Sequence, residues 1–258
     1  MKIGNKVFEN YTFVMAIINL TPDSFWENSR HTADDILFAV DRAVNEGAAV
    51  IDLGAQSTRP NYTEVSADEE LRRLERPLKM IKERFDIPVS VDTYYSKCAA
   101  AALSLGADMI NDVWGLTRDR DMAKVIADFN ASVCIMHNAD KPVINLWNSV
   151  EEFLKSNARL AEISGVSADK IILDGGIGFA KSREQNFELL NGYERLHALG
   201  YPLLLGTSRK SFFGGRVEDR LSKTMESTRL AARKKVLFVR VHDVKENARA
   251  IEEEYGRG

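Results

Sequence analysis

Short apolar segments recur along this chain and alternate with longer stretches in which apolar residues return every three or four positions. The eight apolar segments cover residues 14–20, 49–54, 87–92, 108–113, 132–137, 170–175, 201–206 and 236–241. Each is strand-sized and apolar at most positions, as is typical of strands buried on both faces of a parallel sheet.

The stretches between these segments have the pattern of amphipathic helices. They cover residues 33–46, 67–84, 95–105, 119–129, 149–164, 183–199, 217–234 and 244–255. Several expected helix starts carry residues that are common at N-caps, namely Asp34, Ser66, Asp119 and Ser149. Glycines follow several expected helix ends, namely Gly47, Gly106, Gly165 and Gly200.

Eight strand–helix units in one chain predict an α/β fold of the (β/α)8 TIM-barrel type. We expect a single domain over residues 1–258, with residues 1–13 as an N-terminal lead-in segment. An open, doubly wound sheet is the alternative, because periodicity does not show whether the sheet closes.

Composition narrows the classes of function. The chain has 258 residues and a formal net charge of −3, which gives no support to general nucleic-acid binding. Two cysteines are too few for a disulfide framework or a cysteine-based zinc cluster. The apolar run 14–20 is too short to span a membrane and lacks a signal-peptide pattern, so we expect a cytoplasmic protein.

Polar or ionisable residues end nearly every predicted strand, where ligands bind in an α/β barrel. They are Asn19, Asp52, Asp92, Asn111, Asp112, His137, Asp174, Arg240 and His242, with Ser208 and Lys210 just after Gly206. A single Asp or Asn there would be explained by turn capping. A ring of them favours a binding site, although a structural hydrogen bond is an equal alternative for His137.

The ring combines two kinds of chemistry. Carboxylates and an amide suit a flat heterocycle with several N–H groups, and they come from Asp92, Asn111 and Asp174. Cationic donors suit phosphate oxygens, and they come from Arg59, Lys210, Arg240 and His242. The pattern therefore predicts a ligand with a polar ring and an anionic tail. Mg²⁺ is the metal that such oxygen donors and a phosphate would suit.

Seven motifs near the strand ends resemble those of the dihydropteroate synthase family, in the same order. They are NLTPDSF (19–25), STRP (57–60), SVDT (90–93), INDV (110–113), LDGGIGFAK (173–181), GTSRKSF (206–212) and RVHDV (240–244). The resemblance implies a TIM barrel that condenses 6-hydroxymethyl-7,8-dihydropterin diphosphate with p-aminobenzoate. The products are 7,8-dihydropteroate and diphosphate, and the enzyme is expected to be a homodimer.

The resemblance also assigns roles to residues. It implies a pterin site made by Asp92, Asn111, Asp174 and Lys210, of which Lys210, Asp92 and Asp174 are the catalytic group. It implies a diphosphate site made by Asn19, Arg59, Arg240 and His242, with Mg²⁺ bound near Asn19. It implies a p-aminobenzoate pocket made by Thr58, Pro60, Phe179 and Ser208.

The chain departs from the family pattern in several loops. The changes fall at residues 26–29, 54–56, 138–140 and 175. These differences leave two alternatives open, a pterin-binding paralogue that is non-catalytic or has altered chemistry, and a methyltetrahydrofolate–corrinoid methyltransferase. The second needs no anion site, so Arg59, Arg240 and His242 argue against it.

Overall fold

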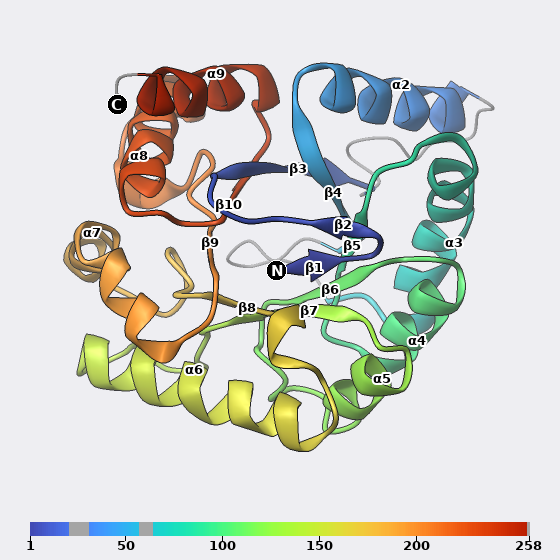
Figure 1. Ribbon diagram of the computed structural model, residues 1–258, viewed down its shortest axis with the longest axis horizontal. Helices are drawn as coiled ribbons and strands as arrows, with labels where there is room; N and C mark the ends of the chain where they lie inside the picture. Colours follow the sequence, from blue (N-terminus) through green and yellow to red (C-terminus); the bar gives the residue numbers. More distant parts are fainter. Residues whose placement is uncertain (21–30, 57–63, 257–258) are drawn as a thin grey trace.

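The computed structural model describes residues 1–20, 31–56 and 64–256. Eight parallel strands close into a barrel in the order β10-β3-β4-β5-β6-β7-β8-β9 (Figure 1). The strands are β3 (Phe13–Asn19), β4 (Ala48–Gly54), β5 (Val89–Asp92), β6 (Met109–Asp112), β7 (Ser132–Met136), β8 (Ile171–Asp174), β9 (Leu203–Leu205) and β10 (Phe238–Val241). Because β10 pairs with both β9 and β3, the predicted barrel is confirmed and the open sheet is wrong.

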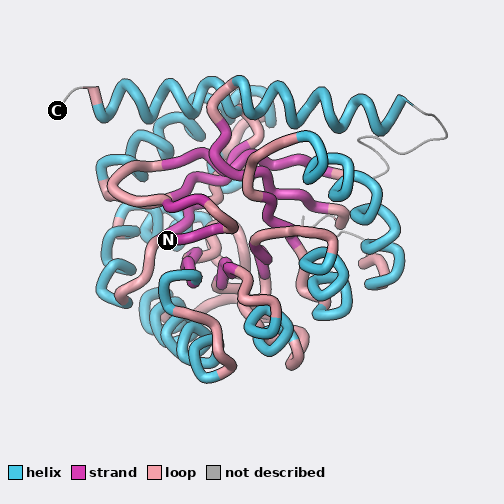
Figure 2. Tube along the Cα trace, turned by 45° about the vertical axis from the view of Figure 1, so that its right-hand side comes forward, coloured by secondary structure: helices cyan, strands magenta, loops and turns pink. Residues whose placement is uncertain are grey.

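Helices form a layer outside the strands (Figure 2). The α-helices are α2 (His31–Asn45), α3 (Ala67–Arg84), α4 (Ser96–Ser104), α5 (Met122–Asp128), α6 (Leu146–Ile163), α7 (Arg183–Asn191), α8 (Leu221–Arg233) and α9 (Val244–Tyr255). The described residues also form four short 3-10 helices, η1 (Ala168–Lys170), η2 (Tyr193–Leu199), η3 (Ser211–Phe213) and η4 (Val217–Arg220). Among the described residues, no helix is long and apolar enough to cross a membrane.

The observed helix starts agree only in part with the N-caps predicted from the sequence. Ser66 caps α3 as predicted, because its hydroxyl accepts the N–H of Glu69 at 3.2 Å. Asp34 and Ser149 lie inside their helices, which begin at His31 and Leu146, so these two predictions are wrong.

Two further predictions at helix ends have different outcomes. Asp119 is not the N-cap of α5, because it precedes that helix by three residues and accepts the N–H of Ser96 at 2.8 Å instead. The four glycines predicted to follow helices all adopt a left-handed φ, between 84° and 105°, which other residues rarely adopt.

Side chains along each strand point alternately out of and into the barrel, so the apolar core has two parts. Outward side chains of the strands pack against the helices in one large apolar cluster, which includes Val14, Ile51 and Val91. Inward side chains at the N-terminal end of the barrel form a second cluster, which includes Met15, Val50, Met109, Ile172, Leu204 and Phe238.

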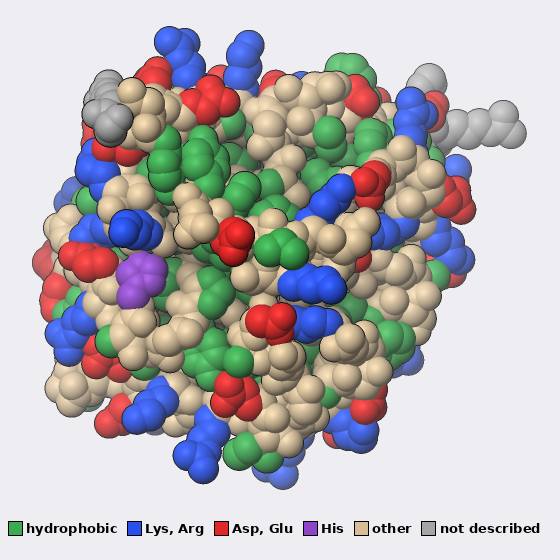
Figure 3. All heavy atoms as spheres, viewed as in Figure 1, with side chains coloured by type: hydrophobic (Ala, Val, Ile, Leu, Met, Phe, Trp, Pro, Cys, Tyr) green, Lys and Arg blue, Asp and Glu red, His purple; other side chains and the backbone are tan. Residues whose placement is uncertain are grey.

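A small hairpin closes the N-terminal end of the barrel. Strands β1 (Lys2–Ile3) and β2 (Lys6–Val7) pair antiparallel over the barrel centre (Figure 1). Ile3 and Phe8 join the inner cluster, where the Phe8 ring lies 5.0 Å from that of Phe238. Seen from this end, charged side chains of both signs are scattered over the face without a broad patch of one sign (Figure 3). Because the hairpin and the inner apolar cluster occupy this end, the strand-end polar groups meet at the opposite, C-terminal end of the barrel.

Replacing Phe238, which has 0% exposure, by alanine should lower the free energy of unfolding by about 3–5 kcal/mol, because it empties the space between hairpin and barrel. Phe38, 68% exposed on α2, is the matched control, and Phe38→Ala should change stability by less than about 0.5 kcal/mol. Urea unfolding of both variants measures the difference. Equal losses would contradict the assignment of Phe238 to a packed inner core.

Candidate active site

The predicted strand-end residues come together inside the C-terminal half of the barrel. In the strand register, Asp92 lies opposite Asn111 on β6, and Asp52 lies opposite Ser90 on β5. The same alternation that buries Met15 and Val50 at one end points Asp52, Asp92 and Asn111 inward at the other. The strands thus bring into one site side chains that are far apart in the sequence.

Arg240 is the centre of this site. Its Nε donates to Asp52 Oδ2 at 2.6 Å and its Nη2 to Asp92 Oδ2 at 2.7 Å. Asn111 Nδ2 also donates to Asp52 Oδ2, at 3.2 Å. One guanidinium therefore links three strands, β4, β5 and β10, and sets the relative positions of two carboxylates.

Burial strengthens the attraction between Arg240 and the two carboxylates, and it also raises the free-energy cost of charging each group. The Asp52 side chain has 0% exposure and that of Arg240 has 21%. Burial opposes the charge on Arg240, but Asp52 and Asp92 outweigh it and raise the pKa of the guanidinium above its ordinary value. Burial raises the pKa of Asp92 to about 7, with Arg240 opposing this shift and Asp52 adding to it. Loss of Arg240 would leave two buried carboxylates without their shared cation.

Asp174 forms the opposite wall of the site. The N–H of Gly176 donates to its Oδ1 at 2.7 Å, and the Tyr193 hydroxyl shares its proton between this oxygen, at 3.1 Å, and the carbonyl oxygen of Leu204, at 2.5 Å. Burial raises the pKa of Asp174, while Lys210 and these two donors oppose the shift. One oxygen of Asp174 is thus held by the protein, and Oδ2 lies toward Gly206, where a side chain would approach it to 3.6 Å.

Lys210 lies between Asp174 and the segment that follows β8. Its ammonium donates to the carbonyl of Ile177 and lies 4.6 Å from the centre of the Phe179 ring. Burial lowers the pKa of Lys210 to about 8, with Asp174 opposing the shift. The structure therefore places Lys210 and Phe179 in contact.

Ser208 and His242 meet at the ends of β9 and β10. The Ser208 hydroxyl lies 2.9 Å from His242 Nδ1 and accepts the backbone N–H of His242 at 3.1 Å. These contacts join the loop that bears Lys210 to the segment that follows β10, the strand that bears Arg240. They also orient the His242 ring, which is half-buried at the mouth of the barrel.

Some predicted residues are not placed. Thr58, Arg59 and Pro60 lie outside the described residues. Asn19 ends β3 and is half-buried, and its Oδ1 lies 3.7 Å from the place of a side chain at Gly54. No cluster of three or more His, Cys, Asp and Glu side chains in the described part of the chain is arranged to hold a metal ion. Asn19 therefore fits a metal only if other ligands bring most of the oxygens.

The turn-capping alternative holds for one strand-end residue. Both carboxylate oxygens of Asp112 accept backbone N–H groups, from Trp114 at 2.8 Å and Leu116 at 2.9 Å. Asp112 thus shapes the turn after β6 and does not join the Arg240 cluster.

His137 makes structural hydrogen bonds, which is one of the two alternatives that the sequence left open for this residue. Its Nε2 lies 3.2 Å from the Ser149 hydroxyl and its Nδ1 lies 2.8 Å from the ammonium of Lys181. The sequence did not predict a role for Lys181 or Tyr193. It also did not indicate that Asp52 and Asp92 share the Arg240 guanidinium. A helical tyrosine or a lysine in a glycine-rich loop carries no local signal of such a contact.

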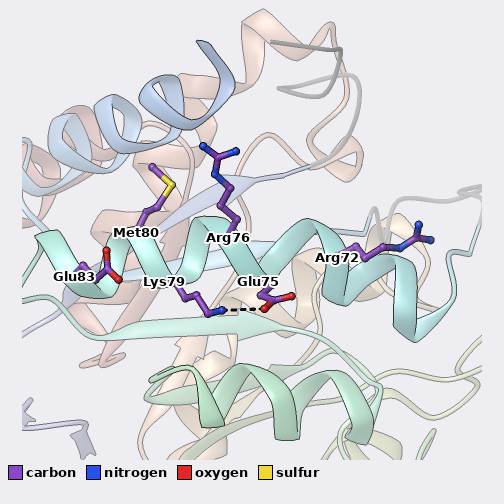
Figure 4. Close-up of a pocket in the computed structure, with 6 residues that line it drawn as sticks. All are labelled: Arg72, Glu75, Arg76, Lys79, Met80 and Glu83. Atoms are coloured by element: carbon purple, nitrogen blue, oxygen red, sulfur yellow. Dashed lines mark hydrogen bonds and ion pairs between the residues drawn. The ribbon is translucent and has the colours of Figure 1, made fainter. Parts of the chain in front are cut away.

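A pocket also lies outside the barrel, on the exposed face of α3. It is lined by Arg72, Glu75, Arg76, Lys79, Met80 and Glu83 (Figure 4). Lys79 pairs with Glu75 one turn away, at 2.9 Å. All of its lining comes from one charged helix face, which is typical of a solvated surface.

The buried His137 should make stability depend on pH. Burial, and then Lys181, lower its pKa to about 3, whereas an unfolded histidine titrates near 6.5. Below about pH 6.5 the unfolded chain binds a proton that the folded chain does not. This group therefore removes up to about 1.4 kcal/mol of stability per pH unit as pH falls.

His137→Asn keeps an acceptor for Lys181 but removes this titration, so its loss of stability between pH 6.5 and 4.5 should be smaller than in the unaltered chain. Urea unfolding across this range measures both slopes. Identical slopes for His137→Asn and the unaltered chain would overturn the assignment.

Known proteins are similar to this chain in both sequence and fold. Residues 15–242 match the family described as pterin binding enzyme. The dihydropteroate synthase of Clostridium beijerinckii is 47% identical, over 97% of this chain and 96% of its own. The synthase of Bacillus subtilis is 39% identical, over 94% of this chain and 87% of its own.

Solved structures that are similar to this chain indicate the same family as these relatives. A dihydropteroate synthase of Clostridium difficile, determined in the presence of pteroic acid, has a TM-score of 0.94 at 43% identity and covers 97% of this chain and 98% of its own. The Xanthomonas albilineans enzyme with 4-aminobenzoic acid has a TM-score of 0.91 at 35% identity, over 96% and 93% of the two chains. The chain therefore belongs to the pterin-binding enzyme family, among the dihydropteroate synthases.

Proposed function

We infer that this chain, as a dihydropteroate synthase, joins 6-hydroxymethyl-7,8-dihydropterin diphosphate to p-aminobenzoate and releases diphosphate. The observation that carries this inference is the pairing of Asp52 and Asp92 with Arg240 beside Asp174 and Lys210. The relatives solved with pteroic acid and 4-aminobenzoic acid support the identity of the product and of the second substrate. None of the relatives reported above is a corrinoid methyltransferase.

The acidic side of the site suits the pterin ring. Asp92, Asn111 and Asp174 offer oxygens for its N–H groups, and the Asn111 amide also offers a donor. Lys210 lies between Asp174 and Phe179, so its ammonium donates to the ring on one side and borders the second substrate on the other. The carboxylates also stabilise positive charge on the pterin.

The reaction needs no covalent bond to the protein. The C–O bond to diphosphate breaks and its electron pair leaves with the diphosphate, which makes the pterin methylene carbon electron-poor. The amine of p-aminobenzoate donates its lone pair to this carbon and then loses a proton to the departing diphosphate or to water. Asp92 and Asp174 favour the cationic pterin by charge, and the barrel wall keeps water, a competing nucleophile, away.

Arg240 has two tasks in this scheme. Two of its five N–H groups bind Asp52 and Asp92, and no other described residue accepts the remaining three. Those donors suit the oxygens of the leaving diphosphate. His242 and Arg59 complete the anion site in this proposal.

We also propose that Mg²⁺ accompanies the diphosphate at Asn19. A single amide oxygen suits this ion when phosphate oxygens and waters supply the other ligands. Bound there, the ion would neutralise negative charge on the leaving group.

Two broader properties belong to the proposal as well. The family resemblance supports a homodimer and a cytoplasmic location. A sedimentation mass of one chain rather than two, at micromolar concentration, would contradict the dimer. Recovery of the activity outside the cytoplasmic fraction of its cell would contradict the location.

The test of the function is formation of dihydropteroate and release of diphosphate with Mg²⁺ present. Release should require p-aminobenzoate, because the amine traps the electron-poor pterin. A chelator should stop release, and added Mg²⁺ should restore it. Binding of the pterin diphosphate without release, with all components present, would identify a non-catalytic paralogue.

Asp174→Asn should weaken binding of both the bare pterin and its diphosphate, each by about tenfold or more, because a charged hydrogen bond to the ring contributes about 1.5–3 kcal/mol. Calorimetric titration with both ligands measures the effect. Asp128, exposed on α5 and paired with Lys124, supplies the control Asp128→Asn, which should bind both normally. Normal binding by Asp174→Asn would refute the assignment of this wall of the site to the pterin.

A further inference from the structure

A second lysine lies behind the site and makes an unusual set of contacts. The ammonium of Lys181 lies 2.9 Å from the carbonyl oxygen of Gly176, 3.1 Å from that of Phe179 and 2.8 Å from Nδ1 of His137. An ammonium has three N–H donors, so all three are matched by acceptors. Lys181 is half-buried, and burial lowers its pKa to about 7.

The histidine partner is fixed in the state that this contact needs. His137 is buried and its pKa is lowered to about 3, so the ring is neutral. A neutral ring that accepts from Lys181 at Nδ1 carries its proton on Nε2, which donates to the hydroxyl of Ser149 on α6 at 3.2 Å. Lys181 is thereby anchored to the end of β7 and to α6.

The two carbonyls belong to the segment that forms the Lys210 side of the site. Gly176 also donates its N–H to Asp174, and a side chain there would lie 1.8 Å from the carbonyl oxygen of His137. Between the two carbonyls lies Ile177, whose own carbonyl accepts from Lys210. The second carbonyl belongs to Phe179, whose ring lies under the Lys210 ammonium.

We propose that Lys181 is a positioning residue of the synthase, which holds residues 176–179 so that Phe179 and Lys210 are presented to p-aminobenzoate. Lys181 binds this segment from behind, and Lys210 binds it from the site. Asp174 is held separately by Tyr193, so the pterin side does not depend on Lys181 alone. The inference rests on the proposed function, because it assigns Phe179 and Lys210 to the second substrate.

The test compares the KM for p-aminobenzoate, kcat and the Kd for the pterin diphosphate in Lys181→Met. Methionine has a similar length but no donors. The KM should rise about tenfold, with kcat and the pterin Kd within about threefold of the unaltered enzyme. Lys141, exposed on the neighbouring loop, supplies the control Lys141→Met, which should match the unaltered enzyme in all three.

A second variant separates positioning from folding. Lys181→Ala leaves space for n-propylammonium, which should restore the KM toward its normal value, whereas tetramethylammonium, which has no N–H donor, should not. A lower kcat at unchanged KM in Lys181→Met would indicate only a smaller folded fraction and would overturn the proposal, as would unchanged values of both constants. Absence of turnover in the unaltered chain would refute the proposed function instead.

Discussion

The shared ion pairing of Arg240 with Asp52 and Asp92 is the interaction on which the site depends. Two carboxylates at this depth would repel each other and resist ionisation without a cation between them. The guanidinium lies between them and offsets their negative charge, and it ties the last strand of the barrel to the second and third. Barrel closure and the polarity of the site are thus linked, because β10 both completes the sheet and carries the neutralising charge.

The fold could be predicted because it follows from the alternation of apolar segments and amphipathic stretches. The gathering of Asp92, Asn111, Asp174 and Arg240 inside the barrel followed from one rule, that strand ends of a parallel barrel meet at one face. Capping was predicted less well. Ser66 is a true cap, but Ser149 lies within α6, because the helix starts a turn earlier at Leu146, whose side chain is buried.

The partners of the site residues could not be predicted from the sequence. Asp112 and Asp92 both end strands, yet one caps a turn and the other binds Arg240. The difference lies in which way each side chain points, which depends on strand register and not on residue type. Tyr193 contacts Asp174 and Lys181 contacts His137, which lie far from them in the sequence, and no local pattern encodes such contacts.

The hairpin that closes the barrel has a consequence for synthesis. Residues 1–8 leave the ribosome long before Phe238, against which Phe8 packs. A long-range contact of this kind forms only after both of its partners have been translated. The growing chain therefore exposes Ile3, Phe8 and an open barrel until β10 has been translated, and a product terminated before β10 would present them to chaperones and proteases.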